Sequence, residues 1–133
     1  MIYLTRDELL DLHLVGVERW GGRLGIRSQD RLLAALAAPQ QMMFGVELHP
    51  ELADKVATLG FQLLKHRPFF GGNEVTALLA MLRMLKLNDA APSESCAIKL
   101  AQAARQVMRS ELSREGLADL IRRFALQPRP EFF

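Results

Sequence analysis

The sequence predicts an all-α protein, a compact single domain of about six helices around a buried central helix. Three observations lead to this fold class. Apolar residues recur with the 3.6-residue period of an α-helix along most of the chain, and the best strand candidate is short. Residues that cap or stop helices stand at the ends of the periodic segments. With 133 residues, 50% of them hydrophobic, the chain is long enough to bury one core without disulfides or metals.

The first helix begins at a capping box. Thr5 is a favourable N-cap, and Glu8, three residues later, completes the motif. The apolar period continues as far as Trp20, and two glycines, Gly21 and Gly22, follow it. Glycine readily adopts the backbone conformation that ends a helix, so the first helix is predicted to end there.

A second helix and an irregular segment come next. Ser28 caps the helix predicted over residues 29–38, and Pro39 stops it. Residues 40–48 contain several apolar side chains without a helical period, and Gly45 interrupts them. This segment is predicted to be a loop or a short hairpin that lies over another part of the molecule.

The middle of the chain holds two long helical patterns. Pro50 is expected to open the first, at a position where its missing N–H costs little, and the pattern continues to about His66. The second pattern covers residues 73–87, and its apolar residues surround most of the circumference. It is therefore predicted to be the central, nearly buried helix.

Two more helices complete the predicted domain, and a serine introduces each of them. They are expected from Ser93 or Ser95 to about Met108, and from Ser113 to Phe124 or Leu126. The helical domain is therefore predicted over residues 1–126. Residues 127–133 are expected to form a frayed C-terminal tail.

Composition argues against several classes of protein. The formal net charge is only +2 and the basic residues are scattered, so neither nucleic acid nor an anionic membrane is indicated as a partner. The sequence shows no signal peptide and no membrane-spanning stretch, and a cytoplasmic location is expected. The single cysteine, Cys96, is interpreted as a packed residue. The Cys and His spacing predicts no metal site.

Residues 67–77, which read RPFFGGNEVTA, carry the clearest functional signal. Glycines before a helix let the backbone pass close to a ligand, and the free N–H groups of the first helical turn favour an anion there. From the residues alone, two interpretations stay open. The segment is either a phosphate-binding turn or an ordinary start of a core helix with Asn73 as its N-cap.

This segment resembles the signature of the Fic/Doc family, and in particular of its death-on-curing branch. That signature reads His-Pro-Phe-x-Asp-Gly-Asn-Lys-Arg-Thr-Ala, and its Pro, Phe, Gly, Asn, Thr and Ala positions are kept at Pro68, Phe69, Gly72, Asn73, Thr76 and Ala77. Weaker matches follow the family's order along most of the chain. They are Leu12-His13, Trp20-Gly21-Gly22, Gly25-Ile26-Arg27, residues 33–40 and Leu87-Asn88.

The resemblance implies a helical domain whose signature binds the phosphates of a nucleotide. Fic/Doc proteins transfer part of that nucleotide, usually AMP, to a hydroxyl of a target protein. The death-on-curing branch resembles a kinase that uses ATP to phosphorylate the translation factor Tu, and an antitoxin protein neutralises it by direct binding. The family's histidine is the general base, its aspartate holds Mg²⁺, and its lysine and arginine clamp phosphates.

The positions that perform this chemistry are the ones that differ. The family's histidine falls on Arg67, whose guanidinium stays protonated and cannot act as a base. The aspartate falls on Gly71, the lysine on Glu74 and the arginine on Val75. Loss of a general base costs about 10²–10⁴-fold, and loss of one electrostatic stabiliser costs about 10²–10³-fold. Impaired catalysis is therefore predicted.

Some residues keep two interpretations. His66 either replaces the missing base or is a solvated residue at a helix end, and Glu74 either binds a metal or only suits the helix dipole. Met42, Met43 and Phe44 match the position of the flap that docks targets in Fic-type enzymes, or they anchor a loop. Trp20 is interpreted as a core residue and His13 as a satisfied core or boundary histidine. The arginines at 105, 109, 114, 122 and 123 form solvated helix faces, or a basic patch for an acidic antitoxin segment or nucleic acid.

Three hypotheses about function follow. The first is a catalytically impaired death-on-curing-like protein of a toxin–antitoxin type system. The second is an active toxin that transfers phosphate or AMP from ATP, with Mg²⁺, through an altered site built from Arg67, Asn73 and either His66 or Glu74. The third is an interaction module that binds an antitoxin-like helix in a surface groove. Nucleotide turnover separates the first two, and the third requires only a partner protein.

Overall fold

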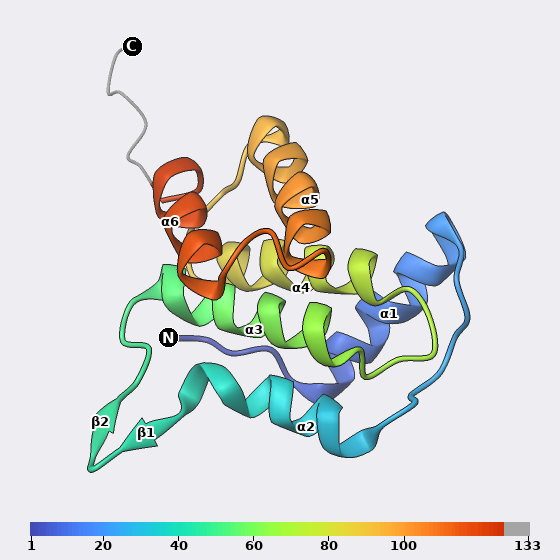
Figure 1. The fold of residues 1–133 in the computed structure, drawn as a ribbon, viewed down its shortest axis with the longest axis horizontal. Coiled ribbons are helices and arrows are strands. Elements are labelled where there is room, and N and C mark those ends of the chain that lie inside the picture. The colour runs from blue at the N-terminus through green and yellow to red at the C-terminus, as the bar shows by residue number, and fades with distance from the viewer. Residues whose placement is uncertain (127–133) are drawn as a thin grey trace.

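A computed structural model describes residues 1–126 of the chain and confirms the all-α fold class (Figure 1). The predicted tail, residues 127–133, lies outside the described part. The helices are α1 Arg6–Trp20, α2 Gln29–Ala37, α3 Leu52–His66, α4 Asn73–Leu87, α5 Glu94–Met108 and α6 Arg114–Phe124. A short 3₁₀ helix, η1 Ala38–Gln40, and a hairpin of β1 Met42–Met43 and β2 Val46–Glu47 join α2 to α3.

The side-chain caps predicted from the sequence are present. Thr5 Oγ1 accepts from the Glu8 N–H at 3.1 Å, and a Glu8 carboxylate oxygen accepts from the Thr5 N–H at 3.2 Å, which completes the capping box. Ser28, Ser93 and Ser113 cap α2, α5 and α6 in the same way, each through its hydroxyl. These caps satisfy N–H groups that a helix start otherwise leaves without an acceptor.

Two proline positions differ from the prediction. The α2 helix ends one residue earlier than expected, because the chain tightens into η1 around Pro39. Pro50 does not open α3. The first intrahelical bond of α3 runs from Lys55 N to Glu51 O, so Glu51 is the N-cap and Pro50 precedes it.

The most enclosed helix is α3, and not the 73–87 helix predicted for that place. Nine of the fifteen residues of α3 are buried, against six of the fifteen in α4. In Figure 1, α3 crosses the middle of the bundle, and it packs against α2, α4, α5 and α6. The α4 helix is less enclosed because its Leu78 and Leu79 are only partly buried and line a cavity. Cys96 is buried in the core, as predicted.

The 40–48 segment forms the short hairpin that the sequence left as one of two alternatives. Its tip residue Phe44 has a left-handed backbone (φ 52°) and is 98% exposed. A buried cation anchors the base of the hairpin to α3. Lys55, only 1% exposed, donates from Nζ to Pro39 O at 3.1 Å and forms an ion pair with Glu47 Oε1 at 3.0 Å.

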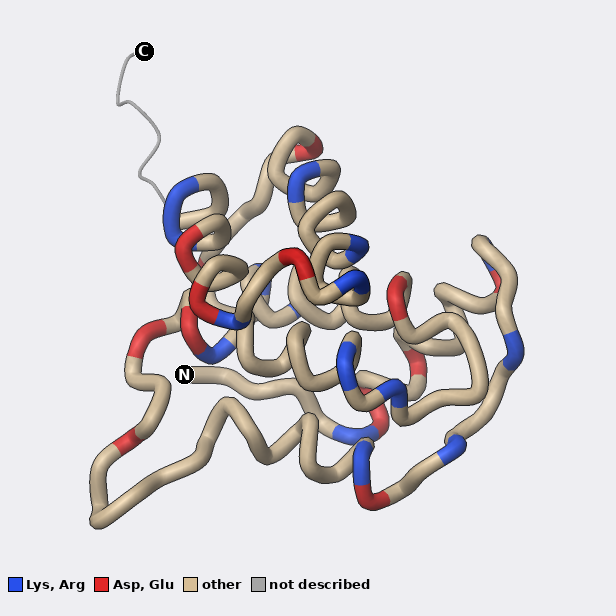
Figure 2. The backbone as a smooth tube through the Cα atoms, viewed as in Figure 1, with Lys and Arg blue, Asp and Glu red and all other residues tan. Residues whose placement is uncertain are grey.

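Charged residues are spread over the fold. In Figure 2, Lys and Arg are interspersed with Asp and Glu along the backbone, as the scattered basic residues of the sequence suggested. Across residues 1–126, none of the helices combines the length and apolar character needed to cross a lipid bilayer.

Candidate functional site

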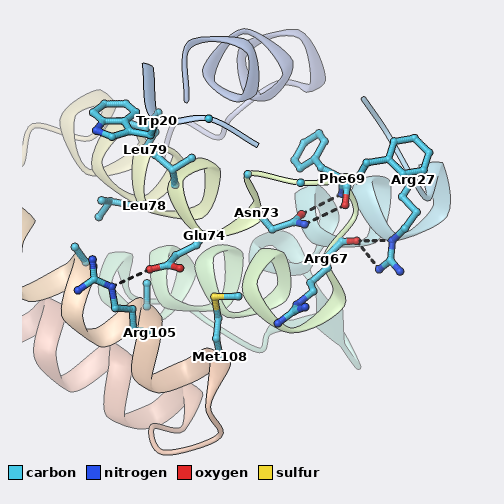
Figure 3. Close-up of a pocket in the computed structure, with 17 residues that line it drawn as sticks. Trp20, Arg27, Arg67, Phe69, Asn73, Glu74, Leu78, Leu79, Arg105 and Met108 are labelled. Atoms are coloured by element: carbon cyan, nitrogen blue, oxygen red, sulfur yellow. Dashed lines mark hydrogen bonds and ion pairs between the residues drawn. The ribbon is translucent and has the colours of Figure 1, made fainter. Parts of the chain in front are cut away.

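A cavity of about 790 Å³ lies where the signature predicted a site. Its walls come from the end of α1, the signature loop (residues 67–72), the start of α4 and one face of α5 (Figure 3). The structure brings six predicted site residues to this cavity: Arg67, Gly71, Gly72, Asn73, Glu74 and Val75. These positions, which the sequence placed at a phosphate-binding turn, therefore share one concave surface.

Asn73 fixes the shape of the signature loop. Its Oδ1 accepts from Phe69 N at 3.0 Å, and its Nδ2 donates to Phe69 O at 3.0 Å (Figure 3). Asn73 is thus not the N-cap of α4, as one interpretation of the sequence had it. The N-cap is Gly72, which has a left-handed backbone (φ 66°) and offers no side-chain acceptor. The first turn of α4 therefore presents N–H groups without a side-chain cap to the cavity.

We expect Asn73→Ala to open the signature loop. The change removes two hydrogen bonds that each contribute about 0.5–1.5 kcal/mol, so the free energy of unfolding should fall by about 1–3 kcal/mol. Urea denaturation followed by circular dichroism measures this change. The control variant is Gln102→Ala, at an exposed position of α5. Asn88→Ala would be a poorer control, because Asn88 also forms hydrogen bonds with the N-terminal segment. Equal stability of the two variants would contradict the role given to Asn73.

Arginines far away in the sequence hold the end of α3 in place. Arg67 is the C-cap of α3 and has a left-handed backbone (φ 44°). Its carbonyl accepts from Arg27 Nη2 at 2.8 Å, and the His66 carbonyl accepts from Arg31 Nη1 at 3.1 Å. Cations at a helix C-terminus are favourable because they meet the negative end of its dipole. The Arg67 side chain remains exposed at the cavity, where it offers positive charge but no base.

The carboxylate position of the signature is closed by backbone packing. A Cβ atom on Gly71 would lie 2.5 Å from Arg23 N, well inside van der Waals contact. The glycine turn, residues 21–25, therefore packs directly on the signature loop. On the other side of the same contact, a Cβ on Gly22 would lie 2.9 Å from Gly72 N. No side chain at position 71 fits the present backbone.

The cavity does not fit the Mg²⁺ ion that the family resemblance implies. Position 71 provides no ligand, and Glu74 is the one acidic residue that lines the cavity within residues 1–126. Nowhere in that part of the chain do three or more His, Cys, Asp or Glu residues gather in a way that could hold a metal. Mg²⁺ usually relies on carboxylate oxygens and needs near-octahedral geometry, which these donors do not supply.

Glu74 is engaged with α5. Its Oε1 accepts from Arg105 Nε at 3.2 Å, and the pair crosses the cavity from α4 to α5 (Figure 3). Arg105 is exposed, as expected for a residue on a solvated helix face, but it also lines the cavity and pairs with the signature, which the sequence did not predict. Both side chains are partly exposed, so the pair contributes little to stability. Its consequence is electrostatic, since a carboxylate faces any anion that approaches α4.

His13 lies behind the signature loop and is buried, as predicted for a satisfied core histidine. It is 2% exposed, and its ring stacks on Phe69 with 3.8 Å between the ring centres. Nδ1 lies 3.1 Å from Thr76 Oγ1, and Nε2 accepts from Gly25 N at 3.2 Å. Burial lowers the pKa of His13. The ring thus connects α1 with α4, the signature loop and the glycine turn.

Trp20 lies at the rim of the cavity and not in the core. It is 61% exposed, because it is the last residue of α1 and Gly21 turns the chain away from the bundle. The amphipathic pattern of α1 continues to this residue, so sequence reasoning assigned it to the core. The wall formed by Ala101, Ala104 and Met108 of α5 was also missed, since no motif marks those residues.

Four other predicted site residues do not line the cavity. His66 is the exposed last residue of α3. Met42, Met43 and Phe44 belong to the hairpin, which precedes α3, whereas the signature loop follows it. A helix of fifteen residues is about 22 Å long, and Figure 1 shows the hairpin and the signature loop at opposite ends of α3. The hairpin therefore does not face this cavity in the present arrangement.

Comparison with known proteins agrees with the geometry of the signature. A profile described as "Fic/DOC family" matches residues 3–85, which is more than half of the chain. The chain belongs to the Fic/DOC family. It is also similar to Toxin Doc from Mycolicibacterium smegmatis (strain ATCC 700084 / mc(2)155), with 36% identity over 86 residues. That match covers 65% of this chain and 64% of the relative, and it confirms the resemblance to the death-on-curing branch.

The residues covered by the family match do not include all the residues that line the cavity. The matched residues of this Fic/DOC protein end within α4, so they include the glycine turn, the signature loop and Glu74. The α5 helix, with Arg105, lies beyond them. One wall of the cavity is therefore built by a part of the chain that the family match does not cover.

Proposed function

We propose that this protein is a Doc-like member of a toxin–antitoxin type system that has lost efficient nucleotide transfer and acts through a protein partner. The backbone contact between Gly71 and Arg23 carries the proposal. If there were space for a side chain at this position, a substitution could restore the missing carboxylate. Here the space for it is occupied by the glycine turn, so a metal-assisted phosphoryl or nucleotidyl transfer lacks its anchor.

The remaining side chains support the same proposal. Transfer to a hydroxyl needs a group that accepts the hydroxyl proton, and Arg67 cannot do so. Glu74 carries a carboxylate, but Arg105 Nε donates to it at 3.2 Å and holds it at the wall of the cavity. The same carboxylate opposes the approach of a polyphosphate.

An antitoxin is the partner that this proposal favours. The relative is named Toxin Doc, and this chain matches the Fic/DOC family over residues 3–85. Binding to such a partner uses surface and shape, so it does not require the lost catalytic groups. A translation factor as a second partner, and with it a cytoplasmic location, remain expectations from the family resemblance.

The second candidate is an active toxin that uses ATP, and one observation favours it. The first turn of α4 has no side-chain cap, and its N–H groups face a cavity that also holds Arg67 and Arg105. Such a helix start attracts phosphate groups. Under this alternative, ATP binds with its phosphates at Gly72 and Asn73, and transfer proceeds without the usual carboxylate ligand for Mg²⁺.

Calorimetric titration of the full chain with ATP, with and without Mg²⁺, tests the proposal. We expect at most millimolar binding, about 4 kcal/mol or less of binding free energy, and no tightening by Mg²⁺. A parallel assay with γ- and α-labelled ATP and a cell extract should label no protein beyond those labelled in the extract alone. Micromolar binding that depends on Mg²⁺, or a labelled target, would establish the active toxin instead. Co-expression with the neighbouring reading frame and copurification then test the partner.

A further inference from the structure

The glycine turn and the signature loop are joined mainly through their backbones. Phe70 N donates to Gly25 O at 3.0 Å, and just after the glycine turn Arg27 N and Ser28 N both donate to Pro68 O, at 2.7 and 3.0 Å. Figure 1 shows the two connecting segments, α1 to α2 and α3 to α4, on the same side of the bundle. Both segments contribute residues to the lining of the cavity, so their contact lies at its edge.

A single buried side chain, His13 of α1, supports this joint from behind. It contacts three separate parts of the chain, which are Thr76 on α4, Phe69 in the signature loop and Gly25 in the glycine turn. The distances are 3.1 Å to Thr76 Oγ1 and 3.2 Å to Gly25 N. Neither the family chemistry nor the proposed function uses this ring.

The partners of His13 define its protonation state. The Gly25 N–H is only a donor, so Nε2 must accept and therefore carries no proton. Nδ1 then carries the proton of the neutral ring and donates it to Thr76 Oγ1. Adding a second proton would place a hydrogen on Nε2 directly against the Gly25 N–H. The bond to the glycine turn cannot exist in that state.

We propose that neutral His13 is a positioning residue that holds the glycine turn against the signature loop, and that its protonation releases the turn and widens the cavity. The glycine turn is suited to such movement, because Gly21, Gly22 and Gly25 all have positive φ angles. This inference concerns the shape of the site. It does not depend on whether the protein transfers nucleotide.

The charged side chains on the segments around His13 have other partners. Arg23 stacks on the Phe70 ring, Arg27 donates to the Arg67 carbonyl, and Glu74 pairs with Arg105. Arg67 points its guanidinium toward the cavity, on the far side of the signature loop. The groups that touch the ring, a hydroxyl, an amide and an aromatic ring, are all neutral. Burial is accordingly what lowers the pKa of His13.

The direction of the pH effect follows from that lowered pKa. In the unfolded state the ring has the ordinary histidine pKa of about 6.5, and burial lowers this pKa in the folded state. The closed arrangement therefore has its full stability above pH 6.5. It loses stability as the pH falls below 6.5 toward the folded pKa.

Trp20 provides a local reporter for the experiment. It is the only tryptophan of the chain, it lines the cavity, and it directly precedes the glycine turn. The chain has three histidines, so the double variant His49→Gln/His66→Gln leaves His13 as the only histidine. We expect Trp20 fluorescence of this variant to change as the pH falls below 6.5, as in the wild type. Adding His13→Gln, which keeps a donor and an acceptor without titrating, should abolish the change.

Trypsin measures release of the turn directly, because Arg23 lies inside it. At pH 8, His13→Leu should raise the rate of cleavage after Arg23 about tenfold, since the bond to Gly25 and the bond to Thr76 are both lost. His66→Gln is the matched control and should leave this rate unchanged. Unchanged helical circular dichroism shows that the variant is folded.

Three results would overturn the inference. One is a fluorescence transition that persists in the variant without His13. Another is an unchanged cleavage rate in folded His13→Leu. The third is an NMR spectrum in which the neutral His13 ring carries its proton on Nε2. If His13→Leu does not fold, the pH profile of His13→Gln and the tautomer measured in the wild type still decide.

Discussion

ATP binding should become about tenfold to a hundredfold tighter in the triple variant Arg67→His/Glu74→Lys/Val75→Arg. Glu74→Lys removes the carboxylate from the first turn of α4, adds a cation there and frees Arg105 for a phosphate. Val75→Arg adds donors to the cavity wall, while Arg67→His restores a group that can accept a proton. Each charge-assisted hydrogen bond contributes about 1.5–3 kcal/mol, which gives the expected range even after partial compensation.

Calorimetry and the labelling assay test this variant against two controls. Glu74→Gln isolates the removal of negative charge and should give a smaller gain. Arg109→His changes an exposed arginine outside the cavity and should give none. An unchanged affinity in the triple variant, with the fold intact, would mean that this cavity is not a nucleotide site. Adding Gly71→Asp should lower stability, because its Cβ meets the Arg23 backbone.

Loss of the buried lysine should destabilise the fold strongly. We expect Lys55→Ala to lower the free energy of unfolding by about 3–5 kcal/mol, because it removes a packed side chain and leaves Pro39 O without its donor. Glu47, half exposed, can return to water and adds less to the loss. Chemical denaturation followed by circular dichroism measures the difference.

Two variants make the Lys55 measurement specific. Lys86→Ala changes an exposed lysine on α4 and should alter stability by about 0.5 kcal/mol or less. Lys55→Met keeps the volume without the charge and should cost less than Lys55→Ala, since apolar replacements of buried ions are often tolerated. If Lys55→Ala matches Lys86→Ala, the lysine does not anchor the hairpin.

The features that the sequence predicted well are those that depend on neighbouring residues. Caps at Thr5, Ser28, Ser93 and Ser113 involve contacts within three residues, and all four are present. The signature positions also lie together, because they follow one another at the start of a single helix. Position in the sequence was sufficient to bring them to one cavity.

The features that the sequence did not predict depend on contacts between distant segments. The Glu74–Arg105 pair joins residues 31 positions apart, and Arg27 reaches the Arg67 carbonyl 40 positions away. Trp20 continues the apolar pattern of α1, but it lies beyond the helices that could cover it and is therefore exposed. That α3 and not α4 is the most enclosed helix also depends on contacts between segments. The apolar pattern of a helix shows how hydrophobic it is, but it does not show which other helices cover it.

Because of the contact between Gly71 and Arg23, the effect of a mutation in the signature loop depends on the conformation of the glycine turn. With the glycine turn in its present position, aspartate at 71 costs stability and brings no function. If a change in residues 21–25 first moved that turn outward, the same substitution could become favourable. The sign of its effect thus depends on a segment almost fifty residues earlier, so engineering of this site would have to exchange both loops as one unit.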